Sequence, residues 1–471
     1  MRPTLLVNTN VARPPVAPLG LEYVCEAVAS AHLPLEVLDL SFEPDWKGAL
    51  QKRLKDCEPL AVGLSVRNTD DCSFVSRKSY LPWIADVVTE IKNLTGAPIF
   101  LGGAGFSTMP ESVLQITKAD FGIEGDGEET AIALSRSLAK NEDITHLPNM
   151  VYWGNGEVAR NPRADVDLRY LPRPHRRTFD NRRYEQLGAM VGIETKRGCS
   201  QRCIYCADPV AKGRSVRTRP PEIVVQELQD LVDQGIRWLH ICDSEFNLPI
   251  EHAKDICRAI VDAGLADKVS WYCYCSPTPF DRELAELMKH SGCAGINFGV
   301  DSLCDEQLRR LGRQHTSKDV GQLTELLHSE GLNYMFDLLV GGPEESEDTL
   351  RVTIDTALRL NVPLVGMAVG LRVYPHTPLA AAIAESSLQK ALHPSPRQDA
   401  WQPLFYLSPL VGDDVFGLME QLVGGDPRFL ILSTPGDEGN YNYCDDEMLC
   451  RLVERGARGA FWDIIRRSRG I

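Results

Sequence analysis

The sequence predicts an α/β protein with two parallel sheets. The first is an N-terminal doubly wound sheet of the Rossmann-like type. The second is a partial (β/α)6 barrel of the TIM type, followed by a small C-terminal region. Three observations support this. Short apolar runs alternate with amphipathic helical segments. Small or polar residues follow the apolar runs, as at the ligand-binding edge of a parallel sheet. The chain has 471 residues, more than one hydrophobic core usually covers, which favours two or three domains.

The first domain is expected over residues 1–142. Its predicted strands are 4–8, 35–40, 60–66, 97–102 and 121–123. The helical segments between and after them are 21–31, 48–55, 79–94 and 130–139. Strands that alternate with helices in this way pair in parallel, so their carboxyl ends meet at one edge of the sheet. The loops after the strands should therefore border a common ligand site.

Those loops are rich in small and polar residues. Glycines there let the backbone approach a large flat or phosphate-bearing ligand, although tight turns alone would also select glycine. The candidate ligand-binding residues are Asn8, Ser65, Arg67, Asn68, Gly102, Gly103, Gly105, Gly125, Gly127 and Glu128. The run from Gly102 to Gly105 is not the dinucleotide fingerprint G-x-G-x-x-G, and it follows the fourth strand rather than the first. A nicotinamide site is therefore disfavoured.

Residues 143–188 are predicted to be a linker. The sequence Gly154-Asn155-Gly156 is typical of a hairpin turn. Eight arginines lie between residues 160 and 183. Their charge could hold an anionic edge of a cofactor between the domains, but a solvated basic connection is favoured.

The second domain is expected over residues 189–390. Its predicted strands are 191–195, 238–242, 270–275, 295–300, 334–340 and 364–373, and its first helices are 221–234, 251–263 and 281–291. Six such strands fit a partial barrel with its chemistry at the carboxyl ends. The pattern weakens in the C-terminal region, residues 391–471. The aromatic residues Tyr441, Tyr443, Phe461 and Trp462 could there be core or pocket wall.

Composition narrows the functional classes. The chain has 65 acidic and 50 basic residues, a net charge of -15, which disfavours binding to a polyanion. No apolar run is long enough to cross a bilayer, and the first residues do not resemble a signal peptide. We therefore expect a cytoplasmic protein with neither nucleic acid nor membrane as a partner.

Three of the 14 cysteines form a group, Cys199, Cys203 and Cys206, on the loop after the first barrel strand. Soft thiolates with this spacing suit zinc or an iron-sulfur cluster. A structural zinc site needs a fourth ligand, and the nearest candidates, His240 and Cys242, lie in a strand pattern. No closed site is evident. Three ligands on a four-iron cluster would leave one iron open to substrate.

This cysteine motif, with Tyr205 before its last member, resembles the radical S-adenosylmethionine superfamily. Segments at four later strand ends resemble the same family: Cys242–Asn247, Phe298–Ser302, Leu338–Glu344 and Leu371–Leu379. The resemblance implies that the three cysteines hold a [4Fe-4S] cluster whose open iron chelates S-adenosylmethionine. It also implies cofactor contacts from Tyr205, Asp243, Ser244, Glu245, Ser302, Gly341 and Arg372.

The segments Leu5–Asn8 and Pro15–Tyr23 resemble the cobalamin-binding domain of cobalamin-dependent radical S-adenosylmethionine enzymes, so the resemblance covers roughly residues 4–390. The motif Asp-x-His-x-x-Gly is absent, and cobalamin is therefore expected without a protein histidine on cobalt. The fold would point Arg67 at the lower cobalt face. Its charge there would disfavour a lower ligand and assist polar methyl transfer, which makes Arg67 the candidate catalytic residue. A salt-bridged loop arginine is an equal alternative.

The resemblance implies a methyltransferase acting on a small molecule, such as a secondary metabolite. Reduction of the cluster by an external donor of the flavodoxin or ferredoxin type would generate a 5'-deoxyadenosyl radical that takes hydrogen from the substrate, and methylcobalamin would supply the methyl group. One alternative is a radical rearrangement or group transfer without methylation, which product masses with labelled S-adenosylmethionine would reveal. Another is a cobalamin or metal sensor without turnover, which would form neither 5'-deoxyadenosine nor S-adenosylhomocysteine.

Overall fold

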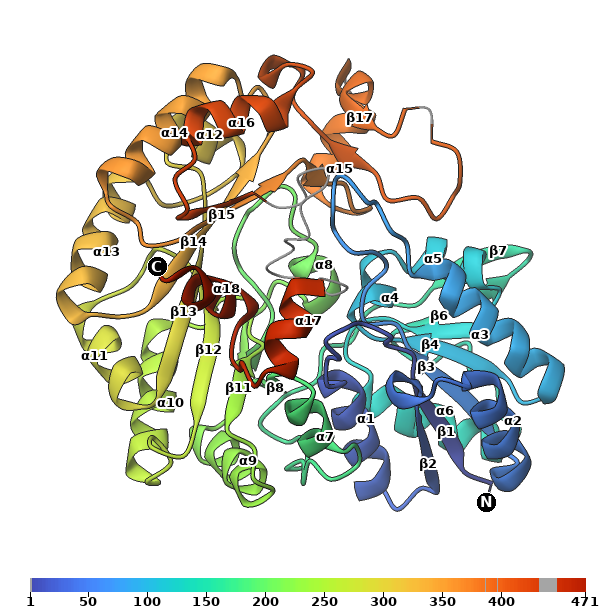
Figure 1. Cartoon of the computed structure of the whole chain (residues 1–471). Helices are drawn as coiled ribbons and strands as arrows, with labels where there is room; N and C mark the ends of the chain where they lie inside the picture. Colours follow the sequence, from blue (N-terminus) through green and yellow to red (C-terminus); the bar gives the residue numbers. More distant parts are fainter. Residues whose placement is uncertain (1, 386, 396, 432–446) are drawn as a thin grey trace.

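The computed structural model describes residues 2–385, 387–395, 397–431 and 447–471, and it confirms the predicted fold class. Figure 1 shows two α/β domains side by side. The first sheet has the order β2-β1-β3-β4-β5-β6-β7. Its strands are β1 (Thr4–Asn8), β2 (Leu35–Asp39), β3 (Ala61–Ser65), β4 (Ile99–Gly102), β5 (Phe121–Ile123), β6 (Met150–Gly154) and β7 (Glu157–Arg160).

Helices cover both faces of the first sheet because its inner strands are buried at successive positions, and successive side chains point to opposite faces. In β1, Leu5 and Val7 face the core formed with α2 and α3, whereas Leu6 faces the core formed with α1 and α6. The helices of this domain are α1 (Leu19–Ser30), α2 (Trp46–Cys57), α3 (Leu81–Leu94), α4 (Ala104–Thr108), α5 (Pro110–Thr117) and α6 (Glu128–Ala139), with the short turn η1 (Leu40–Phe42).

The linker prediction for residues 143–188 is wrong at its start. The hairpin formed by β6 and β7 turns at Asn155 and Gly156, both with positive φ, and β6 pairs antiparallel with β5. The parallel sheet would otherwise end at β5 with unpaired backbone groups, and an antiparallel hairpin satisfies them. The first sheet therefore continues beyond residue 142.

The arginines of this segment are not all solvated. Arg176 is completely buried, and it forms ion pairs at 2.7 Å with both Glu22 of α1 and Glu227 of the second domain. The prediction of a solvated basic connection is therefore wrong at this position. Two buried carboxylates, one from each domain, require a buried cation between them. Arg176 thus joins the domains, and α7 (Asn181–Gln186) follows it.

The second sheet has the order β19-β15-β14-β13-β12-β11-β8, with every pair parallel. The six predicted strands are β8 (Val191–Ile193), β11 (Trp238–Ile241), β12 (Ser270–Cys275), β13 (Cys293–Asp301), β14 (Tyr334–Val340) and β15 (Val365–Val369). A seventh, β19 (Phe429–Ile431), was not predicted because it is short and lies where the alternating pattern weakens. It pairs with β15 and so extends the open side of the partial barrel.

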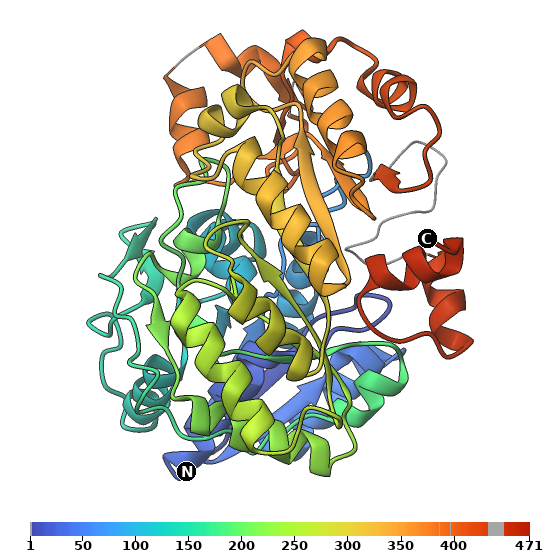
Figure 2. The same ribbon diagram turned by 90° about the vertical axis from the view of Figure 1, so that its left-hand side faces the viewer.

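Helices pack on the outer face of this sheet (Figure 2). They are α9 (Pro221–Asp233), α10 (Ile250–Asp262), α11 (Arg282–His290), α12 (Asp305–Arg310), α13 (Ser317–Glu330), α14 (Glu347–Arg359) and α16 (Val415–Val423). The smaller elements are β9 (Lys196–Arg197), α8 (Asp208–Lys212), β10 (Arg217–Thr218), β16 (Leu371–Arg372), α15 (Pro378–Ala384), η2 (Ser387–Ala391), β17 (Leu392–His393), β18 (Phe405–Tyr406) and η3 (Pro409–Val411).

The C-terminal helices α17 (Glu447–Glu454) and α18 (Phe461–Arg469) pack against the inner side of the second sheet. Trp462 of α18 is buried and contacts Tyr272 edge-on, with ring centroids 6.0 Å apart. Tyr441 and Tyr443 lie outside the described residues. Among the helices that the structure describes, none has the length and apolar character of a membrane span.

Candidate functional site

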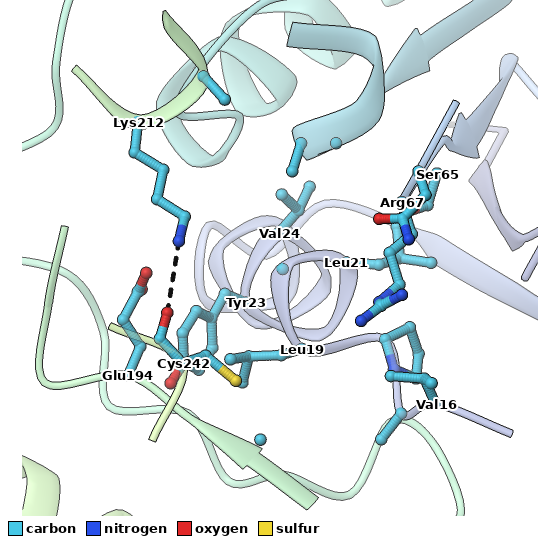
Figure 3. A pocket seen from close by; sticks show the side chains of 18 of the residues that line it. Val16, Leu19, Leu21, Tyr23, Val24, Ser65, Arg67, Glu194, Lys212 and Cys242 are labelled. Carbon is cyan, nitrogen blue, oxygen red and sulfur yellow. Dashed lines mark hydrogen bonds between the residues drawn. The ribbon is translucent and has the colours of Figure 1, made fainter. Parts of the chain in front are cut away.

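A cavity of about 620 Å³ lies between the two domains. One wall is the carboxyl edge of the first sheet, and the other is formed by β8, β11, β12 and β13 of the second sheet. The start of α18 closes one side with Ala460, Phe461 and Trp462. Figure 3 shows Ser65 and Arg67 on one side of the cavity, with Glu194, Lys212 and Cys242 on the other. A ligand in this cavity would contact both domains.

Nine of the ten residues predicted from the first-domain loops line this cavity: Asn8, Ser65, Arg67, Asn68, Gly102, Gly103, Gly125, Gly127 and Glu128. Gly103 has φ +99°, and a Cβ there would lie 2.7 Å from the carbonyl oxygen of Val66, so only glycine allows this turn. Gly105 does not line the cavity. It lies in α4, packed against the backbone of Asn68.

Asn8 and Glu128 are engaged by protein groups. The Asn8 amide donates to Asp39, Ser41 and Tyr184. Glu128 Oε1 lies 2.6 Å from Nη2 of Arg197, while its buried Oε2 has no partner among the described residues. Both side chains therefore position loops at the cavity, and one oxygen of Glu128 remains available to a ligand.

Arg67 lies two residues after the end of β3, and it is exposed and lines the cavity. Within the described part of the chain it forms no salt bridge. The side-chain amide of Asn68 is oriented so that both its nitrogen and its oxygen have partners. Its oxygen accepts a hydrogen bond from Nη1 of Arg67 at 3.1 Å. Arg67 also affects the opposite wall electrostatically. Burial lowers the pKa of His240 most, the charge of Arg67 lowers it further, and the pKa is about 4. A salt-bridged loop arginine is thus not seen in the described residues.

The wall from the second domain contains polar residues that sequence reasoning did not select as cofactor sites. His240, Tyr274 and Asn297 come from three successive strands, and the His240 and Tyr274 rings lie 5.3 Å apart. Cys242 also lines the cavity, and burial raises the pKa of its thiol to about 11. The sequence signal that could have identified these residues is a polar residue within an otherwise apolar strand, as in Ile296-Asn297-Phe298.

Asp243 and Ser244, predicted from the resemblance, lie at the carboxyl end of β11 and line the cavity. Burial raises the pKa of Asp243, but the ammonium of Lys196 at 2.7 Å more than offsets this, and the pKa is lowered overall. Ser244 donates to Asp208, which also pairs with Lys212 at 3.1 Å. These residues form a polar corner beside the cysteine loop.

Cys199, Cys203 and Cys206 lie on the loop between β9 and α8, with little exposure. Burial raises the pKa of the Cys199 thiol to about 11. Burial also raises the pKa of the Cys203 thiol, and Nη1 of Arg313, which donates to Cys203 Sγ at 2.9 Å, opposes that rise. The described residues contain no three His, Cys, Asp or Glu side chains gathered around one ion.

Glu245 follows Ser244 and is directed toward this loop rather than the cavity wall. Burial raises the pKa of its carboxyl to about 7, and its Oε2 has no partner among the described residues. Its charge also contributes to the raised pKa of Cys199 and Cys203, after burial. Glu245 is therefore near the predicted cluster ligands.

The remaining predicted residues do not line the cavity, and their cofactor roles stay predictions. Tyr205 donates to Asp301, and the Ser302 hydroxyl lies 2.9 Å from that of Thr353. The Gly341 amide donates to Glu345. Arg372 pairs with Asp70 at 2.8 Å and stacks on Tyr374 at 4.5 Å, so it ties the loop after β3 to the second domain.

Comparisons with known proteins agree with this architecture. Residues 5–135 match the B12 binding domain, and residues 193–357 match the Radical SAM superfamily. The chain is 33% identical over 446 residues to tryptophan 2-C-methyltransferase from Streptomyces laurentii, covering 81% of this chain and 74% of that protein. The chain belongs to the cobalamin-dependent radical S-adenosylmethionine methyltransferases.

Two solved structures of the radical S-adenosylmethionine methyltransferase TsrM superpose on the whole chain. TsrM from Kitasatospora setae, with tryptophan and a S-adenosylmethionine analogue bound, has a TM-score of 0.92 and 30% identity, covering 100% of this chain and 98% of that one. The structure of TsrM with cobalamin and a [4Fe-4S] cluster has a TM-score of 0.88 and 29% identity, covering 100% of this chain and 99% of that one. OxsB is 18% identical with a TM-score of 0.74, covering 89% and 66%, and shows the shared fold.

Membership of this family confirms the predicted enzyme and the predicted methyl transfer to a small molecule. It also confirms the predicted cofactor set, a [4Fe-4S] cluster, S-adenosylmethionine and cobalamin. The alternatives of a sensor without turnover and of a reaction without methylation are set aside on the same grounds.

Proposed function

We propose that this methyltransferase acts on tryptophan or a close indole analogue and methylates ring carbon 2. The observation that carries the proposal is the full-length similarity to the TsrM structure that holds tryptophan. The name of the Streptomyces laurentii relative supplies the position of methylation. Tryptophan would occupy the cavity between the domains, where both walls are within reach.

The lining of the cavity supports an aromatic amino acid as substrate. Tyr272, Tyr274 and Trp462 offer ring faces and edges, and aromatic pairs gain stability in such contacts. Lys212, on the wall opposite Arg67, places a cation where a substrate carboxylate could bind. The cavity therefore combines an apolar aromatic surface with a few charged groups, as small-molecule sites usually do.

The residues present also fit the cofactors. Cys199, Cys203 and Cys206 would hold the cluster, and the glycine-rich loops at the carboxyl edge of the first sheet would hold cobalamin. When bound, these cofactors supply the methyl group and the means to activate it. The protein orients the substrate between its two walls and excludes water from the cavity.

The test is anaerobic turnover of the reconstituted enzyme with tryptophan deuterated at ring carbon 2. We expect the product to gain one methyl group and lose the deuterium, as measured by mass spectrometry. The variant in which all three cluster cysteines are alanine is the negative control. Methylation at another ring position, with the deuterium retained, would contradict the assigned carbon. No methylated product from tryptophan would contradict the substrate.

We also propose that Arg67 faces the bound cobalamin and acts through its charge, because a guanidinium cannot serve as a cobalt ligand at neutral pH. Replacing Arg67 with Leu removes the charge and should reduce methylated product per enzyme by about ten-fold or more. Cobalamin occupancy should change little. The absorption and electron paramagnetic resonance spectra of the reduced-cobalt state report any new ligand. Unchanged methylation at full occupancy would remove Arg67 from the mechanism.

Two further proposals concern the surroundings of the enzyme. We propose a cytoplasmic location, as the composition suggests, and an external electron donor of the flavodoxin or ferredoxin type. The cysteine loop supports a donor from outside, because Ser200 and Arg202, the neighbours of the buried cluster ligands, are exposed. Electrons could therefore enter close to the cluster.

A further inference from the structure

The cavity contains a buried amide that the family-based predictions do not use. Asn297 of β13 is 3% exposed, and its two chain neighbours, Ile296 and Phe298, belong to the apolar core of the second domain. Asn297 itself lines the cavity. Its Nδ2 donates to Oδ2 of Asp337, on the adjacent β14, at 2.7 Å. Its Oδ1 has no hydrogen-bond partner among the described residues.

The contact with Asp337 fixes which end of the amide is free. An ionised carboxylate only accepts hydrogen bonds, so the nitrogen of Asn297 must point at Asp337 and the oxygen must point away. The hydrogen bond to a charged group also polarises the amide and makes Oδ1 a better acceptor. A buried acceptor without a partner is rare in folded proteins and calls for a donor.

The residues around Asn297 indicate what kind of donor fits. Tyr274 is its direct partner across β12 and β13, and the ring of His240 lies next to Tyr274. Both side chains line the same cavity and both are uncharged at neutral pH, since burial raises the pKa of Tyr274 and lowers that of His240. An aromatic, uncharged wall suits a flat ring that carries a neutral N–H.

We propose that Asn297 is a substrate-positioning residue whose Oδ1 accepts a hydrogen bond from the ring N–H of an indole. The inference rests on the proposed function and deepens it, because it names the group on the substrate that the enzyme recognises. Other N–H donors expected in the cavity are the ammonium groups of S-adenosylmethionine and of tryptophan itself and the side-chain amides of cobalamin, and the experiment separates the ring N–H from these sources.

The experiment measures equilibrium binding to enzyme loaded with cobalamin and cluster. Two probes are compared, tryptophan and its analogue in which sulfur replaces the ring N–H, β-(benzothiophen-3-yl)alanine. The unchanged enzyme should bind tryptophan roughly ten-fold more tightly, the effect of one buried hydrogen bond. Asn297→Leu should lose this preference by weakening tryptophan alone, and the affinity for S-adenosylmethionine should stay within about two-fold.

Two further variants make the result specific. Asp337→Asn keeps the volume but removes the carboxylate that orients Asn297, so it should reduce the preference for tryptophan. Asn333→Leu is the matched control, because Asn333 also donates to an aspartate, Asp463 at 3.0 Å, but does not line the cavity. It should keep the full preference. If Asn297→Leu does not fold, Asp337→Asn carries the test.

Each other outcome overturns the inference. A retained preference in both Asn297→Leu and Asp337→Asn would show that Oδ1 does not contact the ring N–H. Weaker binding of S-adenosylmethionine, with tryptophan unaffected, would assign Oδ1 to the ammonium. If the unchanged enzyme binds and methylates tryptophan, the proposed function stands even when this inference fails. If it neither binds nor methylates tryptophan, both fail.

Discussion

Simultaneous replacement of Cys199, Cys203 and Cys206 by alanine is expected to abolish cluster binding and all methylation. Cysteine thiolates are the usual ligands of iron-sulfur clusters, and a four-iron cluster held by these three proposed ligands would lose its anchor in the loop between β9 and α8. Anaerobically reconstituted variant should lack the brown absorbance and contain no cluster iron. Product formation should fall below detection, because S-adenosylmethionine would lose the open iron that binds it.

The matched control uses two other cysteines that lie close together. Cys273 and Cys275 of β12 have sulfur atoms 3.8 Å apart and are buried in the core of the second domain. The double variant Cys273→Ser, Cys275→Ser should retain its full iron content. A triple alanine variant that still held a full cluster would show that the ligands are other cysteines, with Cys273 and Cys275 the first candidates.

Replacing Arg176 with Met should lower the free energy of unfolding more than any other substitution proposed above. Removing one partner from a buried ion pair costs about 3–5 kcal/mol, because a charge stays buried without compensation. Arg176, Glu22 and Glu227 are all completely buried. Glu227 keeps Arg219 at 2.7 Å, so Glu22 becomes the unpaired charge. The midpoint of urea unfolding should fall accordingly.

Two variants separate this cause from a general effect of losing an arginine. Arg169 is exposed, and among the described residues its only salt bridge is the local one with Asp167, so Arg169→Met should leave the unfolding midpoint unchanged. Adding Glu22→Gln to Arg176→Met should recover part of the lost stability, since it removes the unpaired charge. A single Arg176→Met variant as stable as the unchanged enzyme would mean that the buried pairs do not hold the domains together.

Local sequence patterns were sufficient to predict much of the architecture. The predicted strands of both domains match the observed ones to within a few residues, because each is a short apolar run bounded by turn residues. The glycine loops were predictable for a similar reason, since parallel strands bring their carboxyl ends to one edge whatever the details of packing. The hairpin and β19 were not placed in the sheets, because pairing partners distant in sequence leave no local signal.

The sequence by itself indicated the cofactors and the radical S-adenosylmethionine superfamily, through the cysteine spacing and the ordered segments at the strand ends, but it left methylation and radical rearrangement as alternatives. These motifs act through residues close together in the chain, so they can be read without coordinates. Only the tertiary structure decided what depends on residues far apart in the chain. Arg176 lies 154 positions from Glu22, and Asn297 lies 40 positions from Asp337. Burial made an arginine that was expected to be solvated into the link between the domains, and packing left the amide oxygen of a cavity-lining residue buried without a partner among the described residues. Such outcomes depend on which groups, distant in the chain, are buried together away from water. The spacing of residues along the chain does not encode this.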